Sequence, residues 1–495
     1  MKRLACLSLA LAALALSPVA QGAETEPLPP DSAVEVLVTW QRPDARFPWR
    51  RERPGARQGY GVFVSPTHVI TTDELVRNAT LVEVRQPGRG RKWTARVVQA
   101  DARANVAVLD VANLSADTPF KPVTLDGAVP RAEKVQIVTF DEAGQMKSGD
   151  GRITEAAVEP MQDASSSILL FKVLTDLKTD GQGLPVFHHG RLAGLVMEYD
   201  SEAQSSVVIP APILKQVVDD IATPPYKGLA SAGLLWMPLV DPAKRRYLKL
   251  PDDNRGILVT RLLPGSGASQ ALKPGDVILS WDGKPIDSQG YYTDEVYGRL
   301  LLTHLICGRR RPGDSVPVAI IRGGATVDVA VTLSAYNDHE ALVPRNPEDE
   351  PADYLVEGGL VLRELSLDYL RSFGGKWMVT AHPRLVNLYL TRALTPDTPG
   401  QRIVILSGIL PDPINIGYQG YHDEIVTKVN GQAVRSLDDV FAVVKRDGGV
   451  RRLAFDTTPL DLVLDPAGLS EANHRLAQQY RIPHLMSRRS AVPVP

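Results

Sequence analysis

The sequence predicts a mostly β protein, with a β-barrel domain over residues 33–224 and two smaller α+β units after it. Short runs of alternating apolar and polar residues, at 33–39, 94–98 and 106–111 among others, are broken by Gly, Pro and Asp, as expected for half-buried strands. Two later segments, 275–283 and 423–431, each contain an acidic turn, a short apolar strand and an Asp-Gly or Asn-Gly hairpin. A chain of 495 residues is also too long for a single hydrophobic core, because domains usually contain ~100–200 residues. Three folded units are therefore expected.

Residues 1–23, before the barrel, have the pattern of a signal peptide. Lys2 and Arg3 precede an apolar run over 4–16, and small residues follow as far as Ala23. The mature chain is then expected to start near Glu24 and to be periplasmic or secreted. No later run approaches the roughly 18 apolar residues that a spanning helix needs, so no transmembrane segment is expected in the mature chain.

The mature chain is expected to be nearly neutral and to carry a single cysteine. The sequence has 55 basic and 57 acidic residues, and Lys2 and Arg3 leave with the signal peptide. No concentrated basic face is expected, so nucleic acid is not an expected partner. Loss of Cys6 leaves Cys307 without a partner for an intramolecular disulfide.

The barrel is predicted to end in a helix that follows Pro212, because proline is tolerated in a first helical turn. Apolar residues recur there at helical spacing, at 213, 214, 217, 218 and 221. Residues 223–227 and the charged, proline-bearing stretch 344–353 are predicted linkers. The predicted domains are therefore 33–224, 225–340 and 354–490, and in the last of them Ser436 is a predicted helix start.

Neither a metal site nor a cofactor is expected. His188 and His189 are adjacent, and neighbouring residues on a strand point to opposite faces. Gly190 follows them, which favours an exposed hairpin over a metal pair.

Three motifs resemble the Deg/HtrA family of trypsin-like serine proteases. Residues 61–65 and 69–76 are similar to the family's strand and its Thr-Asn-Ala-His-Val segment, with Glu74 at the histidine position. Residues 101–109 are similar to its Asp-x-x-x-Asp-Leu-Ala-Leu-Leu segment, with Asn105 at the aspartate position. Residues 181–185 and 190–194 resemble its nucleophile loop and the hairpin after it, with Gln182 in place of serine. The resemblance implies a trypsin-like double β-barrel followed by two PDZ-like α+β domains.

Five further motifs narrow the resemblance to the plant-type Deg proteins: residues 47–49, 342–344, 358–361, 414–418 and 481–487. Members of this family form trimers through the N-terminal part of the barrel. The resemblance therefore implies a homotrimer, or a hetero-oligomer with an active relative. Phe47, Pro48 and Trp49 are candidates for that contact.

The residues at the three triad positions cannot perform serine protease chemistry. The triad needs a nucleophilic hydroxyl, an imidazole base and a carboxylate that fixes its tautomer. Gln182 has no nucleophilic oxygen, Glu74 has no second ring nitrogen and Asn105 carries no charge. Asp180, two residues before Gln182, would also repel a developing oxyanion. Asp73 and Glu74 are interpreted as solvated loop charges rather than as an acid site.

The expected binding sites lie in the two PDZ-like units. A Gly-apolar loop in such domains offers backbone N–H groups to a chain-terminal carboxylate, and the peptide adds a strand to the sheet. The candidate peptide-binding residues are Gly233, Leu234, Leu235 and Trp236 in the first unit and Gly359, Leu360 and Val361 in the second. Both segments also fit ordinary core strands. In the first unit, residues 256–261 are the expected neighbouring strand, and Leu234 and Trp236 are expected to line an apolar pocket whose core is separate from the barrel.

Three functions remain open at this stage. The chain is a catalytically inactive homologue that binds unfolded or C-terminal peptide segments in envelope protein quality control, or an active serine endopeptidase whose catalytic residues lie elsewhere, or a regulatory subunit of an active relative. The second would need a Ser or Cys close to His68, His188 or His189.

Overall fold

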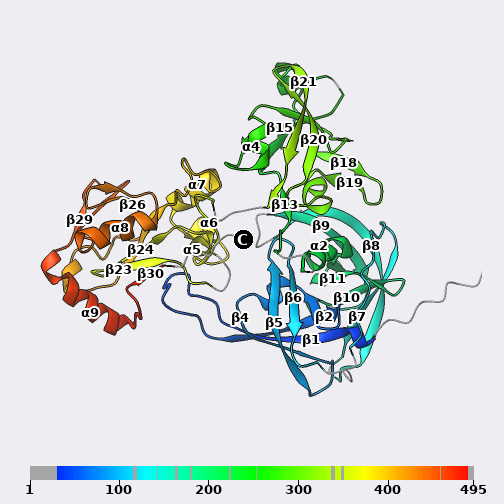
Figure 1. Cartoon of the computed structure of the whole chain (residues 1–495), viewed down its shortest axis with the longest axis horizontal. Helices are drawn as coiled ribbons and strands as arrows, with labels where there is room; N and C mark the ends of the chain where they lie inside the picture. The colour runs from blue at the N-terminus through cyan, green and yellow to red at the C-terminus, as the bar shows by residue number, and fades with distance from the viewer. Residues whose placement is uncertain are drawn as a thin grey trace, which may run out of the picture.

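The computed structural model describes residues 30–114, 120–141, 143–161, 166–178, 181–221, 225–251, 253–335, 340–346, 350–457 and 459–488. The predicted signal peptide and Asp180 lie outside these residues. Within them, no helix has the length and apolar character needed to cross a membrane. Figure 1 shows the two barrels together at the lower right, one α+β unit above them and the other at the left.

Two closed six-stranded barrels form the N-terminal half, which confirms the predicted double barrel. The first has the strand order β1-β2-β3-β6-β5-β4 and the second β10-β11-β12-β9-β8-β7. The first barrel contains β1 (Ala33–Trp40), β2 (Gly55–Phe63), β3 (His68–Thr71), β4 (Ala79–Arg85), β5 (Lys92–Asp101) and β6 (Val106–Val111). The second contains β7 (Lys134–Phe140), β8 (Met146–Pro160), β9 (Ser167–Thr175), β10 (Pro185–His188), β11 (Arg191–Asp200) and β12 (Ser205–Pro210).

The alternating pattern of each strand places one face inside its barrel. In β5, Trp93 and Ala95 are buried while their neighbours are exposed. Strand β6 differs, because it packs on both faces and every residue except Asp110 is buried. The short helix α1 (Asp73–Val76) follows β3, and α2 (Ala211–Ile221) follows β12. Ile213, Leu214 and Val217 of α2 are fully buried, as their spacing predicts.

The first α+β unit has a sheet of strand order β14-β15-β16-β20-β21, with β17 paired to β16. Two further pairs, β13–β22 and β18–β19, lie outside this sheet. Its strands are β13 (Ala230–Ser231), β14 (Leu234–Pro238), β15 (Ile257–Leu262), β16 (Val277–Trp281), β17 (Lys284–Pro285), β18 (Tyr291–Asp294), β19 (Gly298–Leu301), β20 (Ser315–Arg322), β21 (Ala325–Thr332) and β22 (Ser334–Ala335). Its helices are α3 (Pro242–Tyr247), α4 (Gly267–Ala271) and the π-helical turn η2 (His304–Gly308).

The core of this unit is continuous with the core of the second barrel, which corrects the expectation of a separate core. One cluster of buried residues runs from Ile153 and Phe171 of the barrel to Tyr297 and Leu300 of the β18–β19 hairpin. The rings of Phe171 and Tyr297 have centroids 5.8 Å apart. The hairpin lies between β17 and β20 in the chain. Its apolar residues follow neither a helical nor a strand period, so the sequence does not reveal that it packs on the barrel.

The second α+β unit is built on one eight-stranded sheet of order β29-β28-β26-β25-β24-β23-β30, with β27 paired to β26. Its strands are β23 (Tyr354–Glu357), β24 (Leu360–Glu364), β25 (Val404–Ile409), β26 (Glu424–Val429), β27 (Gln432–Ala433), β28 (Arg452–Phe455), β29 (Leu462–Val463) and β30 (Met486–Ser487). Its helices are α5 (Leu367–Arg371), α6 (Trp377–Thr380), α7 (Pro383–Arg392), α8 (Leu437–Asp447) and α9 (Leu469–Tyr480). Short 3-10 turns stand at η1 (Pro30–Ser32), η3 (Pro413–Asn415) and η4 (Pro466–Gly468).

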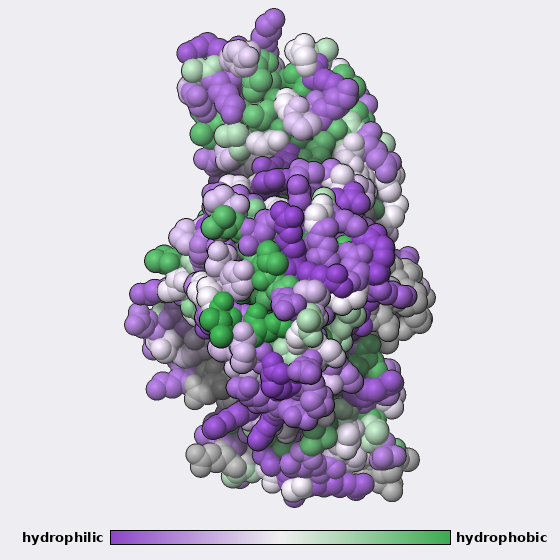
Figure 2. Space-filling view, turned by 90° about the vertical axis from the view of Figure 1, so that its left-hand side faces the viewer, coloured by the Kyte–Doolittle hydropathy of each residue, from purple (hydrophilic) through white to green (hydrophobic). Residues whose placement is uncertain are grey.

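Helix α8 begins as predicted, with the Ser436 hydroxyl accepting a hydrogen bond from the Asp439 N–H. Figure 2 shows the side of the molecule that this unit occupies; it is mainly hydrophilic, with a hydrophobic patch near its middle. Exposed apolar residues of the unit include Ile416, Leu460 and Val463. The boundaries 33–224, 225–340 and 354–490 stay predictions.

The loop between β1 and β2 carries Phe47, Pro48 and Trp49, and it docks on the second α+β unit of the same chain. The Trp49 and Tyr354 rings have centroids 5.7 Å apart, and the guanidinium of the fully buried Arg363 donates a hydrogen bond to the Ala45 carbonyl at 2.5 Å. Trp49 is thus engaged within the chain, whereas Phe47 is 39% exposed. The trimer contact proposed for this motif stays a prediction, and Phe47 is the part of it available to a partner.

Candidate functional site

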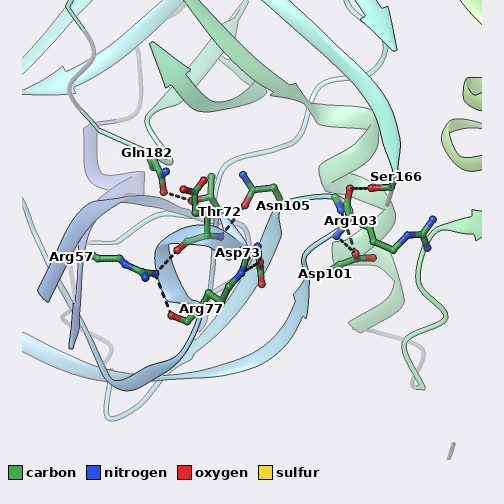
Figure 3. A network of polar contacts seen from close by, with 11 residues as sticks. Arg57, Thr72, Asp73, Arg77, Asp101, Arg103, Asn105, Ser166 and Gln182 are labelled. Carbon is green, nitrogen blue, oxygen red and sulfur yellow. Dashed lines mark hydrogen bonds and ion pairs between the residues drawn. The ribbon is translucent and has the colours of Figure 1, made fainter. Parts of the chain in front are cut away.

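Glu74 and Asn105 meet at the start of helix α1. Asn105 lies in the β5–β6 loop, where its backbone has φ of +50°, in the left-handed region that asparagine tolerates better than most residues. Its side-chain oxygen accepts a hydrogen bond from the Glu74 N–H at 2.9 Å. Figure 3 shows the Asn105 side chain directed toward the segment that carries Thr72 and Asp73. Asn105 therefore fixes the backbone of α1, while the Glu74 side chain is exposed.

Gln182, in the loop before β10, also contacts the start of helix α1. Its side-chain oxygen accepts a hydrogen bond from the Thr72 hydroxyl at 3.4 Å, and its carbonyl accepts one from the Tyr60 N–H at 2.8 Å. Gly183 follows with φ of +79°, and a Cβ there would lie 2.0 Å from the Tyr60 carbonyl oxygen. Only glycine fits this close approach, so the loop is held tightly against β2.

The three residues predicted to occupy the triad positions line one cleft of about 250 Å³. The complete lining is Glu74, Arg77, Ala102, Asn105, Met161, Gln182, Met197 and Glu198. None of these described residues is a Ser, Thr, Cys or His, so the cleft wall offers neither a nucleophilic hydroxyl or thiol nor an imidazole base. Met161, Met197 and Glu198 were not singled out from the sequence, because they come from distant strands with no motif around them.

Asp73 is a buried structural charge and not a solvated one, which corrects the interpretation from the sequence. Its side chain is 0% exposed and pairs at 2.6 Å with Arg77, the residue that follows α1. Burial raises the pKa of Asp73, and the Arg77 charge and its hydrogen bond oppose that rise. Glu74 is the exposed member of the pair, as expected. The spacing of four residues between Asp73 and Arg77 is the sequence signal that could have revealed the ion pair.

His68 and His188 of the two barrels lie outside the cleft lining. His68 accepts or donates a hydrogen bond at Nδ1 with the Ser65 hydroxyl, at 2.8 Å, and Ser65 also accepts one from the His68 N–H. This pair closes the tight turn between β2 and β3. His188 pairs through Nδ1 with Asp126 at 2.8 Å, at the far end of β10.

Cys307 is a poor nucleophile in its buried position. Cys307 is buried, and burial raises the pKa of its thiol to about 11, so very little thiolate exists at neutral pH.

Strand β14 places the predicted peptide-binding residues of the first α+β unit at the edge of a sheet. Among the strands that the structure describes, only β15 pairs with β14. Leu234 and Trp236 pack against the buried cluster shared with the second barrel, whereas Leu235 and Met237 are 37% and 38% exposed. Leu234 and Trp236 therefore fill space in the core. Gly290 has a positive φ, and a Cβ there would lie 2.3 Å from the indole of Trp236.

Successive residues of β14 direct their backbone N–H and C=O groups alternately toward β15 and toward the open edge of the sheet. The Gly233 carbonyl accepts a hydrogen bond from the Leu263 N–H, on the β15 side. Since this direction alternates from one residue to the next and Gly233 faces β15, the N–H groups of Leu234 and Trp236 face the open edge. The Gly233 N–H donates to the Ser231 hydroxyl at 3.1 Å.

In the second α+β unit, the strand that carries the corresponding candidate residues has a partner on each side. Leu360 and Val361 lie in β24, which is hydrogen-bonded to β25 on one side and to β23 on the other. They are 0% and 4% exposed. Gly359 lies at the turn into the strand, where a Cβ would lie 2.2 Å from the Leu410 carbonyl oxygen. Strand addition needs an open edge, and here β23 of the same chain already occupies it.

Comparisons with known proteins agree with this architecture. Residues 59–195 match the family described as a trypsin-like peptidase domain, and residues 343–489 match the PDZ domain family. The chain is 28% identical over 419 residues to Protease Do-like 2, chloroplastic, of Arabidopsis thaliana, a match that covers 82% of this chain and 66% of that protein. It is 24% identical over 466 residues to Putative protease Do-like 3, mitochondrial, of the same plant, covering 92% of this chain and 79% of that protein.

A bacterial relative extends the same similarity. Probable periplasmic serine endoprotease DegP-like of Chlamydia trachomatis is 22% identical over 432 residues, which is 82% of this chain and 73% of that protein. The chain is a Deg/HtrA protease homologue. Among solved structures, HtrA-type protease AlgW with tripeptide is 18% identical, with a TM-score of 0.48 and coverage of 63% of this chain and 95% of that one.

Proposed function

We propose that this Deg/HtrA homologue is catalytically inactive and binds extended peptide segments with free, apolar C-termini through strand β14. The observation that carries the first part is the lining of the cleft by Glu74, Asn105 and Gln182. Loss of single triad members costs about 10⁴- to 10⁶-fold in turnover, and replacement of all three by residues with no equivalent chemistry removes the covalent mechanism. The proposal includes export, on the pattern of residues 1–23.

The open edge of β14 supports the second part. A peptide strand laid along it would accept hydrogen bonds from the outward N–H groups and place alternate side chains beside Leu235 and Met237, both partly exposed and apolar. A terminal carboxylate near Gly233 would find the backbone in a positive-φ turn, with the Ser231 hydroxyl within reach. The second PDZ-like unit is assigned an assembly role in this proposal, because its own chain fills the equivalent edge.

The test uses the full mature chain and a fluorescein-labelled peptide with an apolar C-terminal residue, followed by fluorescence polarisation. The proposed function requires saturable binding of the free-acid peptide and no cleavage of it, checked by mass spectrometry after overnight incubation. Cleavage of the peptide at a defined bond would instead favour the enzyme hypothesis. Absence of binding, with no cleavage, would leave the regulatory-subunit hypothesis.

A further inference from the structure

The cleft of about 250 Å³ between the two barrels contains a polar group that the fold leaves without a partner. Asn105 is 3% exposed and lines the cleft. Its side-chain oxygen accepts the Glu74 N–H, so its amide nitrogen lies on the other side of the same group. Among the described residues, nothing accepts a hydrogen bond from that nitrogen. Such a donor has to be satisfied by water or by a ligand, and it favours a ligand that presents an oxygen atom.

A β-bulge directs two adjacent side chains of β11 into the same cleft. Val196 pairs with Val208 and Glu198 with Val207, so Met197 is the extra residue of the bulge. Adjacent residues of a regular strand point to opposite faces, whereas a bulge changes that direction locally. Met197 and Glu198 both line the cleft. The bulge therefore adds a thioether and a carboxylate to the wall that the second barrel contributes.

Two exposed carboxylates line the cleft, one from each barrel: Glu74 of α1 and Glu198 of β11. Neither side chain has an ion-pair or hydrogen-bond partner among the described residues. Arg77, the one cation among the described lining residues, pairs with the buried Asp73 at 2.6 Å. Arg57 lies outside the lining, and its guanidinium donates to the Glu74 carbonyl at 2.7 Å. The lining therefore presents negative charge to an occupant.

The sequence beside the lining contains acidic residues and no cation. Residues 162–165 follow Met161, and residues 179–180 come shortly before Gln182; both stretches lie outside the described residues. They contain two aspartates and neither Lys nor Arg. These stretches therefore supply no positive charge that could balance the carboxylates of the cleft.

The apolar part of the lining suits the carbon chain of a basic side chain. Met161 is 8% exposed, and together with Met197 it supplies flexible thioethers that adapt to the shape of a neighbour. Lys and Arg lay their carbon chains along apolar surface while the charged group stays in a polar environment. A volume of about 250 Å³ is below the roughly 300–1,000 Å³ of pockets that hold a drug-sized ligand. It suits one long side chain.

We propose that the cleft binds one lysine or arginine side chain of an extended polypeptide and does not cleave that polypeptide. The cationic group pairs with Glu74 and Glu198. Its carbon chain contacts the two methionines, and the neighbouring backbone carbonyl accepts a hydrogen bond from the Asn105 amide. This site goes beyond the proposed capture of free C-termini by β14, because it needs no chain terminus.

The experiment is isothermal titration calorimetry of the full mature chain with an N-acetylated, C-amidated octapeptide that has one central lysine among Ala and Ser. A peptide with norleucine in place of lysine keeps the carbon chain without the charge. It should bind at least about tenfold more weakly, the equivalent of about 1.4 kcal/mol. Binding of the lysine peptide should weaken as salt is raised, because charge pairs near solvent are screened. Mass spectrometry after the titration should find the peptide intact.

A second arm uses n-butylammonium chloride, which has the cation and a carbon chain but no carbonyl group. It should bind at least about tenfold more weakly than the lysine peptide. Equal affinity for the two would show that the cleft takes a free amine and would overturn the assignment to a polypeptide. Because both ends of the octapeptide are blocked, the titration does not test β14, so either proposal can fail alone.

The variant E74Q/E198Q should weaken binding of the lysine peptide at least about tenfold and leave the norleucine peptide unaffected. The matched control is E155Q, because Glu155 is an exposed residue of β8 outside the lining; it should leave the affinity within about twofold. If the double variant fails to fold, the single variant E198Q, at an exposed position, should still weaken binding about threefold.

Three results overturn the proposal. They are equal affinity for the lysine and norleucine peptides, equal affinity of E198Q and E155Q for the lysine peptide, and no heat of binding up to about 1 mM peptide. Cleavage of the peptide beside its lysine would also overturn it, because the cleft would then be catalytic.

Discussion

The side-chain oxygen of Asn105 accepts a hydrogen bond from the Glu74 N–H at 2.9 Å, so the β5–β6 loop holds helix α1 at its first turn. A carboxylate at position 105 could make the same bond. Under the proposed assignment of positions 74 and 105, the scaffold that positions a triad is kept in this chain while the chemistry of its side chains differs.

The first prediction is that a serine-directed fluorophosphonate does not label the protein. Gln182 supplies no nucleophile, and the only described hydroxyl bonded to its side chain, that of Thr72, belongs to a buried residue. Intact-mass spectrometry after incubation with the reagent checks this. A single covalent adduct mapped to a Ser or Thr of either barrel would show that catalysis uses residues other than those at 74, 105 and 182.

The triple variant E74H/N105D/Q182S should also remain without protease activity. Its serine would sit in a loop whose backbone is held by the Gln182 carbonyl and by Gly183, and an acyl-transfer site also needs donors aimed at the oxyanion. Hydrolysis of fluorescent casein, compared with the unmodified chain, is the readout. Recovered activity would mean that the loop still provides those donors.

The third prediction concerns the buried ion pair. Replacement R77A leaves the Asp73 carboxylate buried without its partner, and removal of one member of a buried pair costs roughly 3–5 kcal/mol. Urea unfolding at pH 7.5 measures the loss. The control is K215A, which breaks the exposed pair with Asp219 and should change the free energy of unfolding by less than about 1 kcal/mol.

The pH dependence of that variant has a definite sign. Burial raises the pKa of Asp73 in the folded state, and in R77A the opposing charge is gone, so the folded pKa rises further. A folded state that binds the proton more tightly than the unfolded state gains stability as pH falls. The difference in free energy of unfolding between R77A and the unmodified chain should therefore shrink between pH 7.5 and pH 5. A difference that stays constant over this range would show that packing, and not the charge of Asp73, accounts for the loss.

The sequence predicted the double barrel well because strand alternation and the Deg/HtrA motifs are local signals, as in β5, β6 and α2. It could not predict the two places where segments distant in sequence pack together. Tyr297 joins the second barrel through an insertion with no periodic pattern, and Trp49 reaches Tyr354 across some 300 residues.

The pairing of β24 on both of its edges could not be predicted from the sequence for a related reason. A Gly-Gly-apolar segment looks the same in sequence whether its strand edge is open or paired. Only the position of β23, a four-residue strand just before it, decides between the two. In the first unit the residues before β14 form the short β13, which pairs with β22 and leaves β14 open.

The fourth prediction is that residues 225–340 do not fold as an isolated unit, because their core includes a face that the second barrel covers. Tyr297 is 3% exposed and contacts Phe171. The variant Y297A in the full chain should lose roughly 3–5 kcal/mol and should lower the melting of both units together. Calorimetry of the full chain checks this. Two separate transitions, of which only one shifts in Y297A, would mean that the units unfold independently in spite of the shared cluster.

The last prediction tests capture of peptide C-termini by β14. Amidating the peptide removes its terminal charge and should weaken binding at least about tenfold, or about 1.4 kcal/mol, because the backbone donors would lose an anion. The variant L235D should weaken binding similarly without unfolding, since Leu235 is partly exposed and points away from the buried cluster that Leu234 joins. V240D is the matched control, because Val240 is 57% exposed and lies beyond the end of β14; it should bind as the unmodified chain does. Fluorescence polarisation with the full mature chain measures all three. Equal affinity for free and amidated peptides would show that this edge does not recognise a terminal carboxylate. If V240D weakened binding as much as L235D, the added negative charge, rather than the loss of a strand contact, would account for the effect.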